Sequence, residues 1–242
     1  QVIGHFIPSA IFAAMSAALP GRLMAPGADP IWLSVWRGQD PSFTLTVFQV
    51  GGTGARPTKD GLNAVGFPSG VAGVPAEVIE SLSPVVLKRR ELRADSGGPG
   101  MWRGGLGQLS EFTRRGEGKW SVSSIADRTQ YPALGLLGGQ AGAPGEVTTG
   151  DGVKLHAKAL KDLTKGEVIH LNLPGGGGYG NPFKREPERV LWDVIEGYVT
   201  AAAAERQYGV AVTYSGAADA LVRLPEEWQV DVARTAVLRR DK

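Results

Sequence analysis

The sequence predicts a mixed α and β protein with a β-rich core, long glycine-rich loops, a buried helix at the N-terminus and a helical C-terminus. Segments of alternating apolar and polar residues fill the middle of the chain, a pattern typical of half-buried strands. The 35 glycines among the 242 residues gather in clusters between these segments. After Pro182 the apolar residues recur at helical spacing. We expect a core unit over residues 1–185 and a helical appendage over residues 186–242.

The N-terminal helix is predicted from an apolar run of nineteen residues without Asp, Glu, Lys or Arg. Pro8 suits a first helical turn, and Pro20-Gly21 ends the run. A signal peptide needs a basic region before its apolar stretch, whereas the first cation, Arg22, follows it. The run is also short for a membrane span. We therefore expect a helix buried through one face, and further residues before Gln1. That face is made of Ile11, Phe12, Met15, Ala18 and Leu19.

The remaining elements follow from periodicity and from turn residues. Strands are expected at 31–38, 42–50, 84–92, 107–115, 119–127, 153–160 and 166–173. A short helix is expected at 74–82, and residues 134–152 are expected to form a loop, because Gly, Pro and Ala dominate them. In the appendage, Gly197 divides a helical pattern over 186–210 into two helices, and a third is expected at 226–240.

Composition argues against several classes of function. The formal net charge is only +2, and the basic residues are scattered except for Lys88-Arg89-Arg90 and Arg239-Arg240, so nucleic acid is not an expected partner. The chain has no cysteine, which excludes disulfides, thiolate metal sites and a cysteine nucleophile.

A possible nucleotide fingerprint, G-x-G-x-x-G, occurs at Gly175, Gly177 and Gly180 within LPGGGGYGNP. A dinucleotide-binding turn must open a helix, whose N-terminal N–H groups hold the pyrophosphate. Here Asn181-Pro182 follows at once, and proline disfavours helical conformation in the residue before it. We expect instead that the glycines allow loops to lie backbone against backbone. The clusters concerned are 51–54, 97–107, 135–145 and 175–180.

Four charged residues among these glycines are the candidates for chemistry: Arg56, Asp60, Asp95 and Arg103. An arginine there could hold a carboxylate or a phosphorylated intermediate, and an aspartate could orient it. The alternative is structural: the aspartates would bond turn amides and the arginines would pair with them across the loops.

Other polar residues give no site. The histidines His5, His156 and His170 lack metal-ligand spacing, so no metal ligand is expected in this chain. Ser69, Ser96 and Thr58 have no evident base partner, so no nucleophile is assigned.

Four motifs together resemble the hydantoinase B/oxoprolinase family. They are GGTGARPTKDG (51–61), ELRADSGGPGMWRGGLGQ (91–108), LGLLGGQAGAPG (134–145) and the segment from LPGGGGYGNP through RQYGVAV (173–212). The order and approximate spacing match the family over residues 1 to about 212, whereas residues 213–242 resemble its tail only loosely.

The resemblance implies one part of an ATP-dependent enzyme complex. B-type polypeptides of the family act with an A-type subunit that binds ATP, and together they open lactam or hydantoin rings; relatives carboxylate acetone or acetophenone. The chain looks like the C-terminal half of a B-type polypeptide. Its implied partners are the N-terminal half, the hydantoinase A-like subunit and a small-molecule substrate, with no nucleic acid or membrane.

The same resemblance implies ATP and a divalent metal, both bound mainly outside this chain, and a cytoplasmic location. A cyclic amide hydrolase is the leading expectation. A ketone carboxylase subunit and a non-catalytic assembly module are the alternatives.

Overall fold

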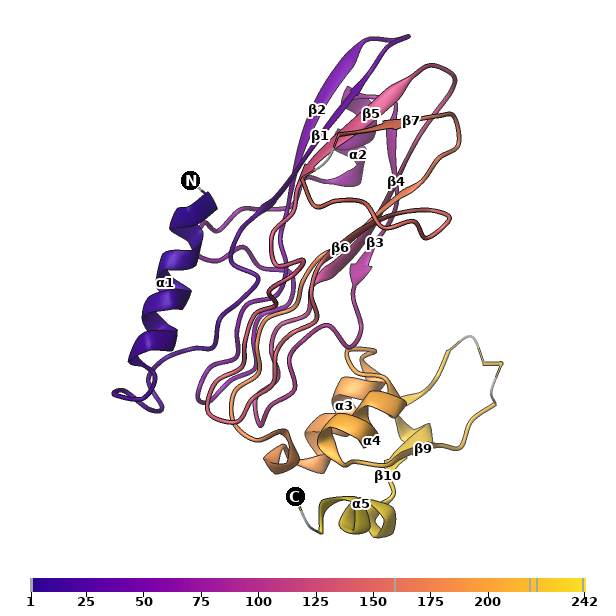
Figure 1. The fold of residues 1–242 in the computed structure, drawn as a ribbon. Coiled ribbons are helices and arrows are strands. Elements are labelled where there is room, and N and C mark those ends of the chain that lie inside the picture. The colour runs from indigo at the N-terminus through magenta and orange to yellow at the C-terminus, as the bar shows by residue number, and fades with distance from the viewer. Residues whose placement is uncertain (1, 159, 218, 221, 241) are drawn as a thin grey trace.

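A computed structural model describes the chain except for residues 1, 159, 218, 221 and 241. Two four-stranded antiparallel sheets lie at one end of the molecule, extended glycine-rich segments run away from them, and the C-terminal helices lie at the far end (Figure 1). None of the helices in the described part of the chain is long and apolar enough to cross a membrane.

Both sheets are built from strands that are separated along the chain. The first has the order β2-β1-β5-β7, formed by Phe43–Gln49, Trp32–Gly38, Trp120–Ile125 and Leu160–Leu163. The second has the order β3-β4-β8-β6, formed by Val85–Leu92, Gln108–Arg114, Ile169–Asn172 and Glu146–Thr149. Six of the seven expected strands are therefore confirmed.

The seventh expected strand, 153–160, is wrong. The strand of this region, β7, begins only at Leu160, and residue 159 lies outside the described residues. Pairing decides its position, because Leu163 lies opposite Trp120 of β5. β6 lies within residues 134–152, which were expected to form a loop. Its four residues pair with β8 but are too few to show a period.

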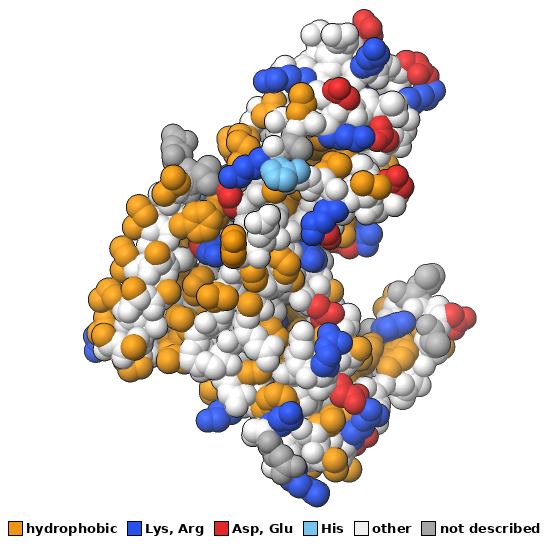
Figure 2. All heavy atoms as spheres, in the orientation of Figure 1, with side chains coloured by type: hydrophobic (Ala, Val, Ile, Leu, Met, Phe, Trp, Pro, Cys, Tyr) orange, Lys and Arg blue, Asp and Glu red, His pale blue; other side chains and the backbone are white. Residues whose placement is uncertain are grey.

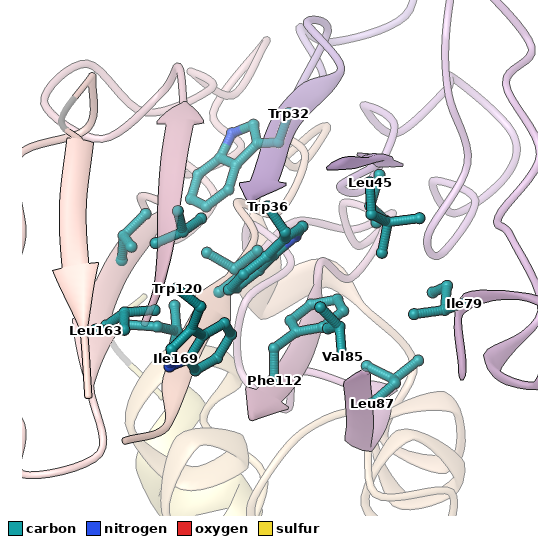
Figure 3. Close-up of a cluster of buried hydrophobic side chains, with 14 of the residues drawn as sticks. Trp32, Trp36, Leu45, Ile79, Val85, Leu87, Phe112, Trp120, Leu163 and Ile169 are labelled. Carbon is teal, nitrogen blue, oxygen red and sulfur yellow. The ribbon is translucent and has the colours of Figure 1, made fainter. Parts of the chain in front are cut away.

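Aromatic side chains hold the two sheets together (Figure 3). The Trp36 ring lies 4.9 Å from that of Phe112 in the second sheet and 5.6 Å from that of Trp120 in its own. The helix α2, Ala76–Leu82, covers β3 with the fully buried Ile79. This core anchors the strands from which the glycine-rich segments leave.

The glycine-rich segments form what we call the glycine bundle, made of residues 25–28, 50–64, 96–107, 133–145 and 173–180. Its central segment is 173–180, which hydrogen-bonds to each of the other segments directly or through a shared neighbour. In Figure 1 these segments run side by side between α1 and the C-terminal helices. The expected backbone-to-backbone contact between glycine clusters is thus confirmed.

The bonding of the central segment repeats every three residues. Gly175 N–H and Gly178 N–H donate to one neighbour, at Ala143 and Gln140, over 3.1 and 2.9 Å. Gly176 N–H donates to another neighbour, at Gly105. A period of three is that of the polyproline II type of helix, which makes no internal hydrogen bonds. The backbone therefore turns its N–H groups to three sides and needs neighbours on all of them.

Because neighbours surround the segment, side chains do not fit. A Cβ atom on Gly176 would lie under 3.0 Å from the Thr53 carbonyl oxygen, and one on Gly177 equally close to that of Leu134. Real Cβ atoms essentially never approach backbone atoms so closely. Four consecutive glycines are thus required by packing on all sides.

The C-terminal part, residues 181–242, has a cluster of buried hydrophobic side chains separate from that of the sheets. The helices and strands of this part are η1 (Pro182–Lys184), α3 (Pro187–Ile195), α4 (Ala201–Tyr208), β9 (Val212–Tyr214), η2 (Pro225–Glu227), β10 (Trp228–Val230) and α5 (Val232–Arg239). Gly197, with φ of 71°, separates α3 from α4, as expected. The third expected helix, 226–240, is wrong in its first part: Trp228–Val230 pairs with β9, and Asp231 caps α5 by accepting the Arg234 N–H.

The helix α1, Val2–Met15, confirms the expected N-terminal helix but not its burial. Four of its large apolar side chains point outward; the exposed fractions are 82% for Ile3, 54% for Ile7, 48% for Ile11 and 42% for Met15. The face buried by this chain is a different one, centred on Ser9. Pro8 lies in the helix interior rather than in its first turn, and Ala18 and Leu19 lie beyond its end.

We predict that Gly176→Ala destabilises the protein by about 3 kcal/mol or more, because the new methyl group has no space beside Thr53. The measurement is urea unfolding followed by circular dichroism. Gly4→Ala is the matched control, since Gly4 lies in α1 and no atom lies within 4 Å of the place that its new methyl group would take. It should leave stability unchanged or slightly higher. Equal effects of the two substitutions would contradict the packing argument.

Candidate functional site

Asp60 and Arg103 meet two C-terminal residues, Arg185 and Asp193, in what we call the ion network. Arg185 binds Asp60 through two parallel bonds, from Nη1 to Oδ1 at 2.7 Å and from Nη2 to Oδ2 at 2.9 Å. Its Nη2 also lies 2.9 Å from Asp193 Oδ2. Arg103 Nε donates to Asp193 Oδ1 over 3.2 Å. Two positive and two negative charges thus compensate one another in a largely buried site, where Asp60 alone of the four side chains is partly exposed.

Burial and charge act in opposite directions on the two carboxyls. Burial raises the pKa of Asp60, but the hydrogen bonds and charge of Arg185 outweigh it, and the pKa is lowered from its ordinary value. For Asp193, burial dominates over Arg103 and Arg185 and raises the pKa. Burial also raises the pKa of Tyr208, which is fully buried. Asp60 is therefore the more strongly held anion of the network.

The ion network connects the glycine bundle with the C-terminal helices. Asp60 and Arg103 belong to two segments of the bundle, whereas Asp193 lies on α3 and Arg185 just before it. Asp60 also accepts the Arg103 backbone N–H over 2.7 Å. Breaking a buried ion pair leaves an uncompensated charge, so such a network holds its elements in one arrangement.

Arg56 lies beside the network but is not part of it. Its Nη2 donates to the Asp60 backbone carbonyl over 3.0 Å, and among the described residues its guanidinium makes no ion pair. The side chain is half-buried at the Arg56–Lys59 turn, where the backbone of the two residues pairs. Of the four candidates, Arg56 therefore keeps its charge free for an anionic group.

Asp95, in the loop that follows β3, lies beside the N-terminus of α4. Its carboxylate accepts the Thr200 backbone N–H and hydroxyl, each over 2.8 Å, and its own N–H donates to the Tyr198 carbonyl. Thr200 in turn caps α4 by accepting the Ala203 N–H. Asp95 therefore holds the loop of the bundle to the N-terminus of this helix. The structure brings three of the four candidates together and leaves Asp95 apart.

The central glycines do not form a free phosphate cradle. The N–H groups of residues 175–180 all donate to carbonyl oxygens of neighbouring segments. Ser96 is likewise committed, since its buried hydroxyl donates to Arg93 O and accepts the Gly107 N–H. Across the described part of the chain, no three His, Asp or Glu side chains gather in a way that could hold a metal ion.

A second charged cluster, not predicted from the sequence, fixes α1. The Asp29 carboxylate is fully buried and accepts bonds from Ser9 Oγ at 2.7 Å and from Arg128 Nη2 at 2.5 Å. The Arg128 guanidinium also lies over the Phe6 ring, 4.8 Å from its centroid. Burial raises the pKa of Asp29 despite these partners. No spacing signals this cluster, because 99 residues separate Asp29 from Arg128.

A hollow of about 450 Å³ lies next to this cluster. Phe6 of α1 lines one side, and the loop through Tyr131 and the segment with His156 and Lys158 line the others. The hollow combines apolar, basic and acidic groups, because Asp127 lines it together with Lys158, and α1 forms part of its wall.

We predict that Asp60→Asn lowers the free energy of unfolding by about 3 kcal/mol at neutral pH, because Arg185 loses one of its two carboxylate partners and the buried network is left with an excess positive charge. A carboxyl with a lowered folded pKa stabilises above its unfolded pKa of about 4 and loses that contribution as the pH falls through the folded value. Urea unfolding of both proteins between pH 7 and pH 2 should therefore show the difference shrinking below about pH 4. A difference in the free energy of unfolding that stays constant from pH 7 to pH 2 would contradict the role of the ionised Asp60. The control is Glu186→Gln, which removes an exposed pair with Arg189 and should have little effect.

The sequence and the fold are both similar to those of known proteins. The chain is 34% identical over 221 residues to the B-type subunit of a putative D-/L-hydantoinase from Pseudomonas sp. (strain NS671), covering 88% of this chain and 37% of that protein. It is 30% identical over 201 residues to the acetone carboxylase alpha subunit of Xanthobacter autotrophicus (strain ATCC BAA-1158 / Py2), covering 66% and 26%.

The fold matches the crystal structure of an ATP-dependent caprolactamase from Pseudomonas jessenii, with a TM-score of 0.74 at 24% identity, over 94% of this chain and 40% of that one. The chain thus spans 26 to 40% of the lengths of these three proteins. The model of the hydantoinase B/oxoprolinase family matches residues 2–182, which include the two sheets and the glycine bundle. The chain therefore belongs to the hydantoinase B/oxoprolinase family.

Proposed function

We propose that this chain is part of the B-type subunit of an ATP-dependent enzyme that hydrolyses a cyclic amide, such as a lactam or a hydantoin. The observation that carries this proposal is the extent of the match. The hydantoinase subunit aligns with 88% of the chain, whereas the acetone carboxylase subunit aligns with 66%. A ketone carboxylase remains the second candidate, because its subunit shares the same family.

In this proposal the chain supplies a rigid wall of the substrate site. Residues closely packed on all sides hold their positions well, and the turn that carries Arg56 belongs to segment 50–64 of the glycine bundle. The Arg56 guanidinium pairs with no described carboxylate, so it can bind a carboxylate or phosphate group of the reactant. Asp60 and Arg103 position the same turn through the ion network.

ATP and its divalent metal belong, in this proposal, to other parts of the complex. The described residues offer neither a cluster of metal ligands nor free glycine N–H groups in the central segment. A hydantoinase A-like subunit would supply the ATP site, and ATP would activate the amide for attack by water. The chain's own contribution is binding and orientation of the reactant.

The test is an assay of the reconstituted complex with ATP. We expect release of phosphate to depend on 5-oxoproline, hydantoin or caprolactam, with ring-opened product formed alongside ADP. If phosphate release depended on acetone or acetophenone plus bicarbonate and on no cyclic amide, the hydrolase proposal would fail and the carboxylase would replace it.

We predict that Arg56→Gln lowers kcat/KM of the complex by about 10- to 100-fold, the equivalent of losing a charged hydrogen bond of about 1.5–3 kcal/mol. Arg37→Gln is the matched control, because Arg37 is exposed at the end of β1, away from the bundle. Thermal unfolding should show that both variants keep their fold. Unchanged kinetics of Arg56→Gln would remove Arg56 from the reactant site.

A further inference from the structure

We propose that the outward face of α1, together with the adjoining loop 131–137, is the surface on which the rest of the B-type polypeptide packs. This proposal rests on the proposed function, because it assumes that the chain works within a B-type subunit. It concerns an interaction surface and not the chemistry of the complex.

The outward face of α1 is a continuous apolar ridge. Ile3, Ile7, Ile11 and Met15 follow one another at intervals of four, so they lie along one side of the helix. All four side chains are between 42 and 82% exposed. Between residues 3 and 15 the helix has no Asp, Glu, Lys or Arg. A contiguous exposed apolar surface of this kind marks an interaction site.

The ridge is held in a fixed orientation. Ser9, on the inward side, donates to the buried Asp29, and Phe6 packs under Arg128. Asp29 is bonded to Arg128 as well, so one charged pair fastens the helix to the loop that follows β5. The outward face is therefore presented as a preformed surface.

The loop 131–137 extends the ridge. Tyr131 lines the same hollow as Phe6 of α1. Near the other end of the helix, the Tyr179 hydroxyl accepts the Gly21 N–H, and Tyr179 is bridged to Leu136. The exposed fractions are 80% for Tyr131, 64% for Leu134 and 52% for Leu137. Figure 2 shows hydrophobic side chains along α1 and on the surface beside it.

The relatives indicate what covers this surface. The chain corresponds to 37% of the hydantoinase subunit and 40% of the caprolactamase chain, so the larger part of each has no counterpart here. A polypeptide of that size can provide an apolar complement. A lipid surface fits less well, because helices that lie on membranes carry Lys and Arg on their polar face and α1 has neither.

The test uses this chain and, as a separate polypeptide, the segment of the same organism's B-type protein that matches the rest of the hydantoinase subunit. Affinity is measured by isothermal titration calorimetry. The double variant Ile7→Glu/Ile11→Glu should weaken binding by about tenfold or more, because two side chains that the partner polypeptide would bury become charged. Leu160→Glu is the control, since Leu160 is 66% exposed on β7, and it should bind like the unchanged chain.

Circular dichroism of each variant shows whether the fold is kept; exposed positions should tolerate the charge. Undiminished binding by the double variant overturns the proposal. So does a dimer of this chain, seen by light scattering, that the double variant abolishes, or α1-dependent binding to vesicles of phosphatidylcholine and phosphatidylglycerol. If the two polypeptides bind each other through α1 but the reconstituted complex shows no ATP hydrolysis that depends on a cyclic amide, the proposed function alone would be refuted.

Discussion

The structure depends on one constraint: backbones in the glycine bundle approach so closely that a Cβ atom cannot lie between them. At Gly176 the space a methyl group would need is taken by the Thr53 carbonyl. The close approach results from hydrogen bonds that the central segment makes to neighbouring segments on three sides. Glycine is costly in backbone entropy, but only glycine permits bonding of this kind on every side. The bundle thereby gains the rigidity that its loops would otherwise lack.

Charged residues at the rim of the bundle connect it to its surroundings. At one side, Asp60 and Arg103 hold the C-terminal helices through Arg185 and Asp193. At another, Asp29 and Arg128 hold α1. In both places the ions are largely buried and paired, so their geometry is specified by a few strong bonds. The bundle is thus a frame on which separate elements are mounted.

Much of this fold follows from local patterns in the sequence, and the rest depends on distant partners. Alternation predicts β1 and β4, and the helix break at Gly197 follows from its residue type. The glycine clusters predict close backbone contact, which the structure confirms. The exposure of the apolar side chains of α1 could not be predicted, because an apolar helix face does not indicate whether residues of the same chain cover it.

The candidate site shows the same division. Arg56, Asp60 and Arg103 stand out among glycines, and the structure brings them together. Arg185, which binds Asp60, is 125 residues away from it in the chain, and no local spacing signals such a pair. The catalytic use of Arg56 stays a prediction.

Hydrogen exchange of the backbone amides tests the central claim most directly. If the N–H groups of residues 175–180 are bonded on three sides, they should exchange as slowly as those of β1 and β4, although they belong to no sheet. Exchange at the rate of an exposed loop would contradict the account, because the central segment would then be solvated.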